Sequence, residues 1–169
     1  MTAALTACGA GAEPTTSTPP TTPTGASPSP TSSEATPEQV ASVIAGKQAD
    51  WREVIEQAGT CRMNWVMKSE DLAETLNRKS CYTREVTAGL TAQAAIRDLG
   101  RLTVPSSMTT LVDKTTAALQ QVIDVDLESA CGPASGEPSG TDECNKALGQ
   151  RMWAYNSLGD ALDMWAPYL

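Results

Sequence analysis

Four cysteines restrict the fold of this 169-residue chain more than any other feature of its sequence. Cys131 ends one helical pattern and Cys144 begins the next, while Cys61 and Cys81 flank a short helical segment. Four cysteines allow three pairings, and this layout favours the two sequence-local ones, Cys61–Cys81 and Cys131–Cys144. The alternative is a set of reduced, buried cysteines in a cytosolic domain. With the local pairing, a bridge from Cys131 to Cys144 closes a helical hairpin across its loop.

Helical periodicity continues through most of the chain after residue 36. Thr36-Pro37-Glu38-Gln39 combines an N-cap, a proline at the first helical position and a capping-box glutamine. The helix that starts there is predicted to end at Gly59. Trp51 and Trp165 lie on apolar stripes and are predicted to be core residues. Further helices are expected over 69–79, about 84–101 with a bend permitted near Gly89, from Pro105-Ser106-Ser107 to Cys131, and from Thr141 to Trp165.

These segments predict an all-α domain over residues 37–169. Strand signals are almost absent, because the chain has no Phe and no sustained alternation of apolar and polar residues. Four main helices joined by short or medium loops are typical of an antiparallel bundle. We therefore expect a four-helix-bundle-like fold with two disulfides.

Residues 9–36 have a different composition, consisting almost entirely of Thr, Pro, Ser, Ala and Gly, with Glu13 and Glu34 as the only charges. Such a segment cannot bury enough apolar surface to offset its ordering entropy. We expect a disordered, proline-stiffened linker with a reach of about 80 Å, at about 3.1 Å per residue. It is either an O-glycosylated stalk or an unmodified linker.

Cys8 is the odd cysteine and lies in Leu5-Thr6-Ala7-Cys8-Gly9, which resembles a bacterial lipobox. With the Thr/Pro-rich stalk and the disulfide-linked helical domain, the layout resembles a small actinobacterial cell-envelope lipoprotein. The resemblance implies a diacylglyceryl thioether on Cys8 and retention at the extracytoplasmic face of the membrane. A complete signal peptide carries a basic region and an apolar region of 7–15 residues, so residues 1–8 are expected to be its remnant. A chance match at Cys8 is the alternative.

The charge of the chain argues against nucleic acid as a partner. Formal net charge is −8, from 12 Lys plus Arg against 20 Asp plus Glu, and the basic residues occur singly. A polyanion is repelled by such a surface, and no basic cluster exists to release counterions.

Most catalytic chemistry is excluded by the absence of histidine. Histidine is the commonest general base, and it activates most Ser and Cys nucleophiles and binds zinc. Acidic clusters occur, but a solvated face explains them better than catalysis or a cation site, and the methionines fit core filling. The sequence thus predicts no enzyme, no metal and no cofactor. The acidic clusters are Glu53 with Glu56 and Asp124 with Asp126 and Glu128.

Two tryptophans do not fit the apolar stripes. Trp153 lies off the buried face of the last helix, and Trp65 lies in the segment between Cys61 and Cys81. Exposed aromatic residues are favoured as interface anchors. The alternative is that both pack under loops or against a short fifth helix.

The sequence favours a membrane-tethered, non-catalytic binding or adaptor module that docks a protein or cell-envelope component. The alternative is a bundle whose internal pocket binds or carries an apolar small molecule. An enzyme that uses carboxylates alone is the third hypothesis, and it requires two acidic groups that face each other in a cleft with raised pKa values.

Lipidation of Cys8 can be tested by the intact mass of protein extracted from membranes. The expected species begins at Cys8 and carries the added mass of a diacylglyceryl thioether. An unmodified Cys8 that is still preceded by Met1 to Ala7 would contradict the lipoprotein assignment.

Overall fold

A computed structural model of the protein describes residues 33–66 and 70–169, and Cys8 and most of the linker assigned to residues 9–36 lie outside them. The chain divides into two units, residues 1–31 and 32–169, and every described helix belongs to the second. None of these helices is long and apolar enough to cross a bilayer. They are α1 (Pro37–Ala45), α2 (Gln48–Val66), α3 (Leu72–Leu99), α4 (Thr109–Ile123), α5 (Leu127–Cys131), α6 (Asp142–Asp163) and the 3₁₀ helix η1 (Ala166–Tyr168).

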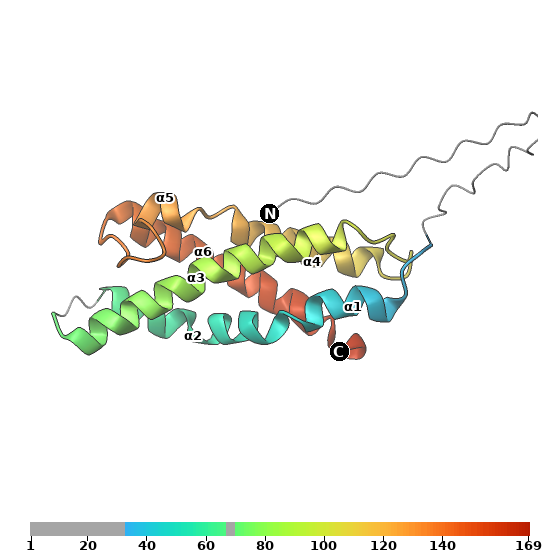
Figure 1. The fold of residues 1–169 in the computed structure, drawn as a ribbon, viewed down its shortest axis with the longest axis horizontal. Helices are drawn as coiled ribbons and strands as arrows, with labels where there is room; N and C mark the ends of the chain where they lie inside the picture. Colours follow the sequence, from blue (N-terminus) through green and yellow to red (C-terminus); the bar gives the residue numbers. More distant parts are fainter. Residues whose placement is uncertain (1–32, 67–69) are drawn as a thin grey trace, which may run out of the picture. The chain divides into compact units, whose positions relative to one another are not determined.

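Four long helices form the bundle. Helix α2 packs against α3 and α6, and α4 packs against the same two helices, so each long helix has two long neighbours (Figure 1). Helix α1 covers one end of the bundle beside η1, and α5 packs on α6 at the other end (Figure 1). The described residues contain no strand. The predicted all-α, four-helix-bundle-like fold is confirmed.

The folded unit begins earlier than residue 37. The Ala35 N–H donates to the Thr103 carbonyl at 2.9 Å, the Glu34 carboxylate accepts from the Ser106 N–H at 3.3 Å, and Ala35 is buried. Residues 33–36 therefore belong to the helical unit, which begins before the predicted start at residue 37. The predicted capping box at Thr36 is present.

The first predicted helix is two helices. Helix α1 ends at Gly46, whose N–H caps it by donating to the Ser42 carbonyl at 3.2 Å, and α2 begins at Gln48. Helix α2 then continues through Gly59, where the sequence predicted its end. A glycine inside a helix costs about 1 kcal/mol relative to alanine. Burial of Ala58, Cys61 and Trp65 along the same face offsets that cost.

Helix α3 is one continuous helix of 28 residues, although two were predicted. The Asp71 side chain caps it by accepting from the Ala73 N–H at 2.7 Å. Cys81 lies inside this helix, so the first disulfide joins the bodies of α2 and α3. Leu72 and Leu76, near the start of α3, are 72% and 56% exposed.

The helix predicted from residue 105 to Cys131 is also interrupted. Helix α4 ends at Ile123, and α5 starts anew because the Asp126 carboxylate caps it, accepting from the Ser129 N–H at 3.0 Å. The predicted start of the last helix is confirmed, since the Thr141 hydroxyl accepts from the Cys144 N–H at 3.2 Å.

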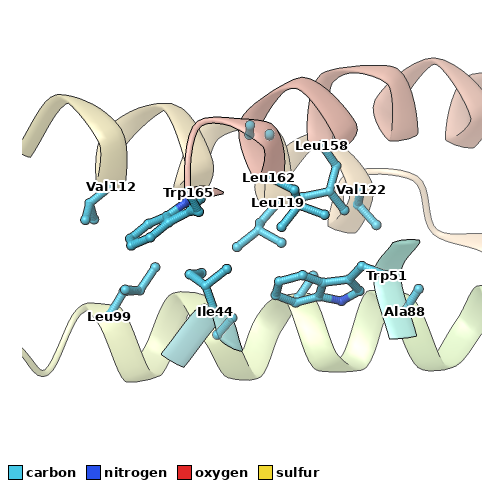
Figure 2. Close-up of a cluster of buried hydrophobic side chains, with 14 of the residues drawn as sticks. Ile44, Trp51, Ala88, Leu99, Val112, Leu119, Val122, Leu158, Leu162 and Trp165 are labelled. Atoms are coloured by element: carbon cyan, nitrogen blue, oxygen red, sulfur yellow. The ribbon is translucent and has the colours of Figure 1, made fainter. Parts of the chain in front are cut away.

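The main core contains the two predicted core tryptophans, Trp51 and Trp165, which are 1% and 0% exposed. Figure 2 shows both indoles between α3 and the pair formed by α4 and α6. Their N–H groups donate to Thr91 and Thr115 at 2.9 and 2.8 Å, so neither buried donor is left unpaired. Helical stripes on α1, α2, α3, α4 and α6 supply the rest of this core.

A second, smaller core surrounds the disulfides. Both sequence-local pairings are confirmed, with Cys61 bonded to Cys81 and Cys131 bonded to Cys144. The buried members of this core are Cys61, Trp65, Tyr82, Leu127, Cys131, Cys144, Ala147 and Leu148.

Replacing Cys131 and Cys144 together with alanine should destabilise the protein by about 3 kcal/mol in the chain-entropy model, because their bond closes a loop with a sequence separation of 13. The measurement is urea unfolding of the double variant and the parent. The Cys61→Ala/Cys81→Ala pair, with a separation of 20, is the matched comparison and should lose a similar amount. A loss well below 1 kcal/mol for both would contradict a stabilising role of the bonds.

Candidate functional site

A buried polar cluster connects α3 to α6 where the two cores meet. Glu85 on α3 is 3% exposed, and Arg151 and Tyr155 on α6 are 4% and 2% exposed. Arg151 and Tyr155 are four residues apart and therefore lie on the same face of α6. Full burial of two ionisable side chains is unusual for Glu and Arg, which makes this cluster the first candidate for a functional site.

Glu85 and Tyr155 form the centre of the cluster. The Tyr155 hydroxyl donates to Oε2 of Glu85. Burial raises the pKa of Glu85 from an ordinary value of 4.5 to about 7, although the Tyr155 hydrogen bond and the charge of Arg151 both act to lower it. Burial, and then the Glu85 carboxylate, hold the pKa of Tyr155 well above its usual value. The pair therefore keeps its protons over most of the range below pH 7.

Arg151 has an incomplete set of hydrogen bonds. Its Nη2 donates to the Val125 carbonyl at 2.7 Å, which ties α6 to the connection between α4 and α5. Nε and Nη1 are buried without a hydrogen bond of ordinary geometry, although an interaction of the Arg151 side chain with the Tyr155 hydroxyl acts to lower the pKa of Tyr155. The guanidinium lies against Gly89 of α3, where an added Cβ would be 3.3 Å from Nη1. A glycine in the middle of α3 therefore provides the space that this guanidinium occupies.

Tyr82, one turn before Glu85, fixes the other side of the site. Its hydroxyl is within hydrogen-bonding distance of the carbonyls of Leu127, at 3.1 Å, and Gly132. Burial raises the pKa of Tyr82 to about 12, with smaller contributions from Glu128 and Asp126. The buried phenol thus holds α5 against α3 and stays protonated at neutral pH.

A pocket of about 240 Å³ opens beside Arg151. It has aliphatic walls, one buried guanidinium and two carboxylates, those of Asp126 and Glu128. Hydrogen bonds from Ser129 lower the pKa of Asp126, so its carboxylate is charged at neutral pH. Glu85 is not among the residues that line this pocket. The lining consists of Val86, Gly89, Leu90, Gln93, Ile123, Val125, Asp126, Leu127, Glu128 and Arg151.

Sequence reasoning missed this cluster, although a signal was present. Arg151 falls on the buried stripe of α6 between Leu148 and Tyr155, and Glu85 falls on that of α3 between Tyr82 and Ala92. A charged residue at an apolar position of a helical stripe is the pattern that could have identified both.

The two tryptophans proposed as interface residues have different environments. Trp65 is only 8% exposed and belongs to the disulfide core, with its indole N–H 3.4 Å from the Arg78 carbonyl. The expectation that Trp65 is available at the surface is wrong, because α2 extends past Gly59 and carries it into the bundle. Trp153 is 76% exposed.

The acidic clusters lie on solvated faces, as predicted. Glu53 is exposed and pairs with Arg84 at 3.0 Å, and the exposed Asp126 caps α5. Within residues 33–66 and 70–169, no group of three or more Cys, Asp or Glu side chains is placed to hold a metal ion.

Comparison with known proteins assigns no role to this site. No protein-family model, curated protein or solved structure matches the chain. What the site can do must therefore follow from its contacts, burial and charge.

The raised pKa of Glu85 predicts that this residue lowers stability as pH rises. Its carboxyl stays protonated in the folded state up to about pH 7, whereas in the unfolded state it ionises near its ordinary pKa of 4.5. The free energy of unfolding therefore falls by on the order of 3 kcal/mol as the pH rises from the lower pKa to the higher one. Glu85→Gln removes the ionisation. Its stability relative to the parent, from urea unfolding, should rise by that amount between pH 4.5 and 8.

Tyr155→Phe is the companion variant for this test. Loss of the hydroxyl removes a hydrogen bond that lowers the pKa of Glu85, so the pH-dependent loss of stability should extend to higher pH. Parallel pH profiles for the parent and Glu85→Gln would show that the pKa of Glu85 is not raised.

Proposed function

We propose that this protein is an extracytoplasmic lipoprotein whose helical domain acts as a non-catalytic binding or adaptor module. The observation that carries the proposal is the exposure of Trp153, which is 76% accessible on a helix whose other large aromatic residue, Tyr155, is buried. Burying a large apolar side chain such as an indole is energetically favourable, and an exposed indole does not gain this free energy. A partner that covers Trp153 would bury the indole and gain that free energy.

The surroundings of Trp153 suit a contact surface. It lies at the centre of the outward face of α6, where the neighbouring exposed side chains are polar: Lys146, Gln150, Asn156 and Asp160. An aromatic anchor within a polar rim is the usual anatomy of a small protein interface. The partner we propose is a protein or another component of the cell envelope.

A non-catalytic role is supported by the chemistry of the described residues. The chain has no histidine. Glu85, the carboxyl whose pKa is raised to about 7, is buried against Tyr155 and does not face a second carboxyl group across a cleft. A general acid or base must reach its substrate, and Glu85 is not among the residues that line the neighbouring pocket.

The tether rests on the sequence alone. Lipidation at Cys8 and a linker of residues 9–32 would hold the helical unit away from the outer face of the membrane. The unit begins at residue 33 with a segment fixed to the α3–α4 connection. This arrangement gives the linker a firm point of attachment.

The alternative, a carrier for an apolar small molecule, has less support. Each pocket found in the described part of the chain has charged side chains in its lining, such as Arg84 beside Trp51 and Arg151 beside Leu127. A purely apolar ligand would remove these charges from water without offering them a hydrogen bond, which is costly.

Trp153→Ala tests the proposed interface. Pull-down from detergent-solubilised envelope should recover a partner with the parent protein, and the variant should bind that partner with a Kd about thirtyfold higher, as expected for loss of an aromatic hot spot of about 2 kcal/mol. Its free energy of unfolding should change by less than about 0.5 kcal/mol, because the side chain is exposed.

Leu72→Ala is the matched control. Leu72 is 72% exposed but lies at the start of α3 rather than on α6, so its removal should leave capture unchanged. Equal capture by the parent and Trp153→Ala would contradict the role given to Trp153.

A further inference from the structure

Arg151 is a buried charged side chain whose hydrogen bonds within the protein are incomplete. Its guanidinium is 4% exposed, yet Nε and Nη1 have no hydrogen bond of ordinary geometry. A buried donor without a partner costs about 1–3 kcal/mol, and more when it is charged. The same guanidinium lines a pocket of about 240 Å³. A ligand that brings oxygen acceptors into this pocket would satisfy donors that the protein itself leaves open.

We propose that the pocket formed by α3, α5, α6 and the α4–α5 connection binds a small zwitterion, an α-amino acid with an aliphatic side chain. Arg151 would bind its carboxylate, and Asp126 and Glu128 its ammonium group. The inference goes beyond the proposed function, because Trp153 lies two residues from Arg151 and so on the opposite face of α6, and because it does not depend on Cys8.

The carboxylate end of the ligand follows from the guanidinium. Arg carries five N–H donors in a planar fork and prefers carboxylate oxygens as acceptors. One donor on Nη2 is used by the Val125 carbonyl at 2.7 Å. Gly89 has no side chain to cover the guanidinium, and a Cβ there would come within 3.3 Å of Nη1. Arg151 is part of the pocket lining, so a carboxylate that enters the pocket would lie beside this side chain.

The ammonium end follows from the two carboxylates in the lining. A simple anion would be attracted by Arg151 but repelled by Asp126 and Glu128, and so would gain little. Asp126 already accepts from the Ser129 N–H and hydroxyl at 3.0 and 2.6 Å, and Glu128 accepts from the Ala134 N–H at 3.1 Å. A carboxylate has about four acceptor positions, so both side chains can also accept from an ammonium group.

The rest of the pocket is suited to an aliphatic side chain. Its walls are branched apolar residues, and Leu90, at 58% exposed, would lose contact with water when the pocket fills. The volume is larger than the ~30 Å³ share of one water and smaller than the ~300–1,000 Å³ of sites for drug-sized ligands. These limits match a metabolite of amino-acid size. The apolar walls are Val86, Leu90, Ile123, Val125 and Leu127.

The test is calorimetric titration of the full chain with L-leucine and two analogues that each lack one charge. 4-Methylpentanoate has no ammonium group, and 3-methylbutylamine has no carboxylate. Leucine should bind saturably, and each analogue at least about tenfold more weakly. No saturable binding of leucine up to about 10 mM, or binding of 4-methylpentanoate as tight as that of leucine, would overturn the proposal.

Gly89→Ala adds a residue-level test without removing a buried charge. The new methyl group would crowd the guanidinium, with its Cβ 3.3 Å from Nη1, so the affinity for leucine should fall at least about tenfold, while the helix propensity of α3 improves. Gly149→Ala is the matched control, because its Cβ would meet Arg62 at 3.0 Å, and Arg62 is not in the pocket lining.

Thermal melting followed by circular dichroism checks that both glycine variants are folded. Unchanged leucine affinity in a folded Gly89→Ala variant would contradict the placement of the ligand on Arg151. Equal weakening in Gly149→Ala would also contradict it. Loss of partner capture in Trp153→Ala with normal leucine binding would show that the two sites are separate.

Discussion

Helix α3 turns alanines towards the interior, and the other helices fill the space that these small side chains leave. Ala88, Ala92 and Ala95 are 3%, 0% and 0% exposed. In a chain without Phe, two indoles and the phenol of Tyr155 supply much of the volume opposite them. Large rings packed against small residues give the interlocking that native cores require. Because each buried indole N–H donates to a threonine hydroxyl, the polar contacts also fix which turn of one helix faces which turn of the next.

The sequence predicted the features that depend on local residue patterns, but it did not predict those that depend on contacts between helices. Stripes of 3.6-residue period and the caps at Thr36 and Thr141 identified the helices and the pairing of the cysteines. Gly59 and Gly89 were expected to end or bend helices, but both lie within continuous helices whose neighbouring residues are buried. Trp65 was proposed as an interface residue, with packing under a loop as the alternative, because the extension of α2 was not visible locally. Glu85 and Arg151 could be understood only once α3 and α6 faced each other across the bundle, because Glu85 on α3 is bonded to Tyr155 on α6 and Arg151 on α6 lies against Gly89 on α3.

The cluster around Glu85 and Arg151 lies where the main core meets the disulfide core. Desolvated charge is costly unless it is paired, and here the pairing is partial: Tyr155 satisfies one carboxylate oxygen, and Val125 satisfies one guanidinium nitrogen. The two disulfides are located in the smaller core on one side of this cluster. The stabilisation from these disulfides acts against the cost of the partly paired charges. The stability of the disulfide core thus helps the protein to keep a buried guanidinium that is only partly hydrogen-bonded.

The covalent bonds are concentrated at the end of the bundle where α5 lies, while the chain enters at the end where α1 lies (Figure 1). At that entry the Ala35 N–H bonds to the Thr103 carbonyl and Glu34 to the Ser106 N–H. Local opening that starts where the chain enters would therefore break these two hydrogen bonds and then α1. Both disulfides of the described residues lie at the other end, so such opening would leave them and the core around them in place.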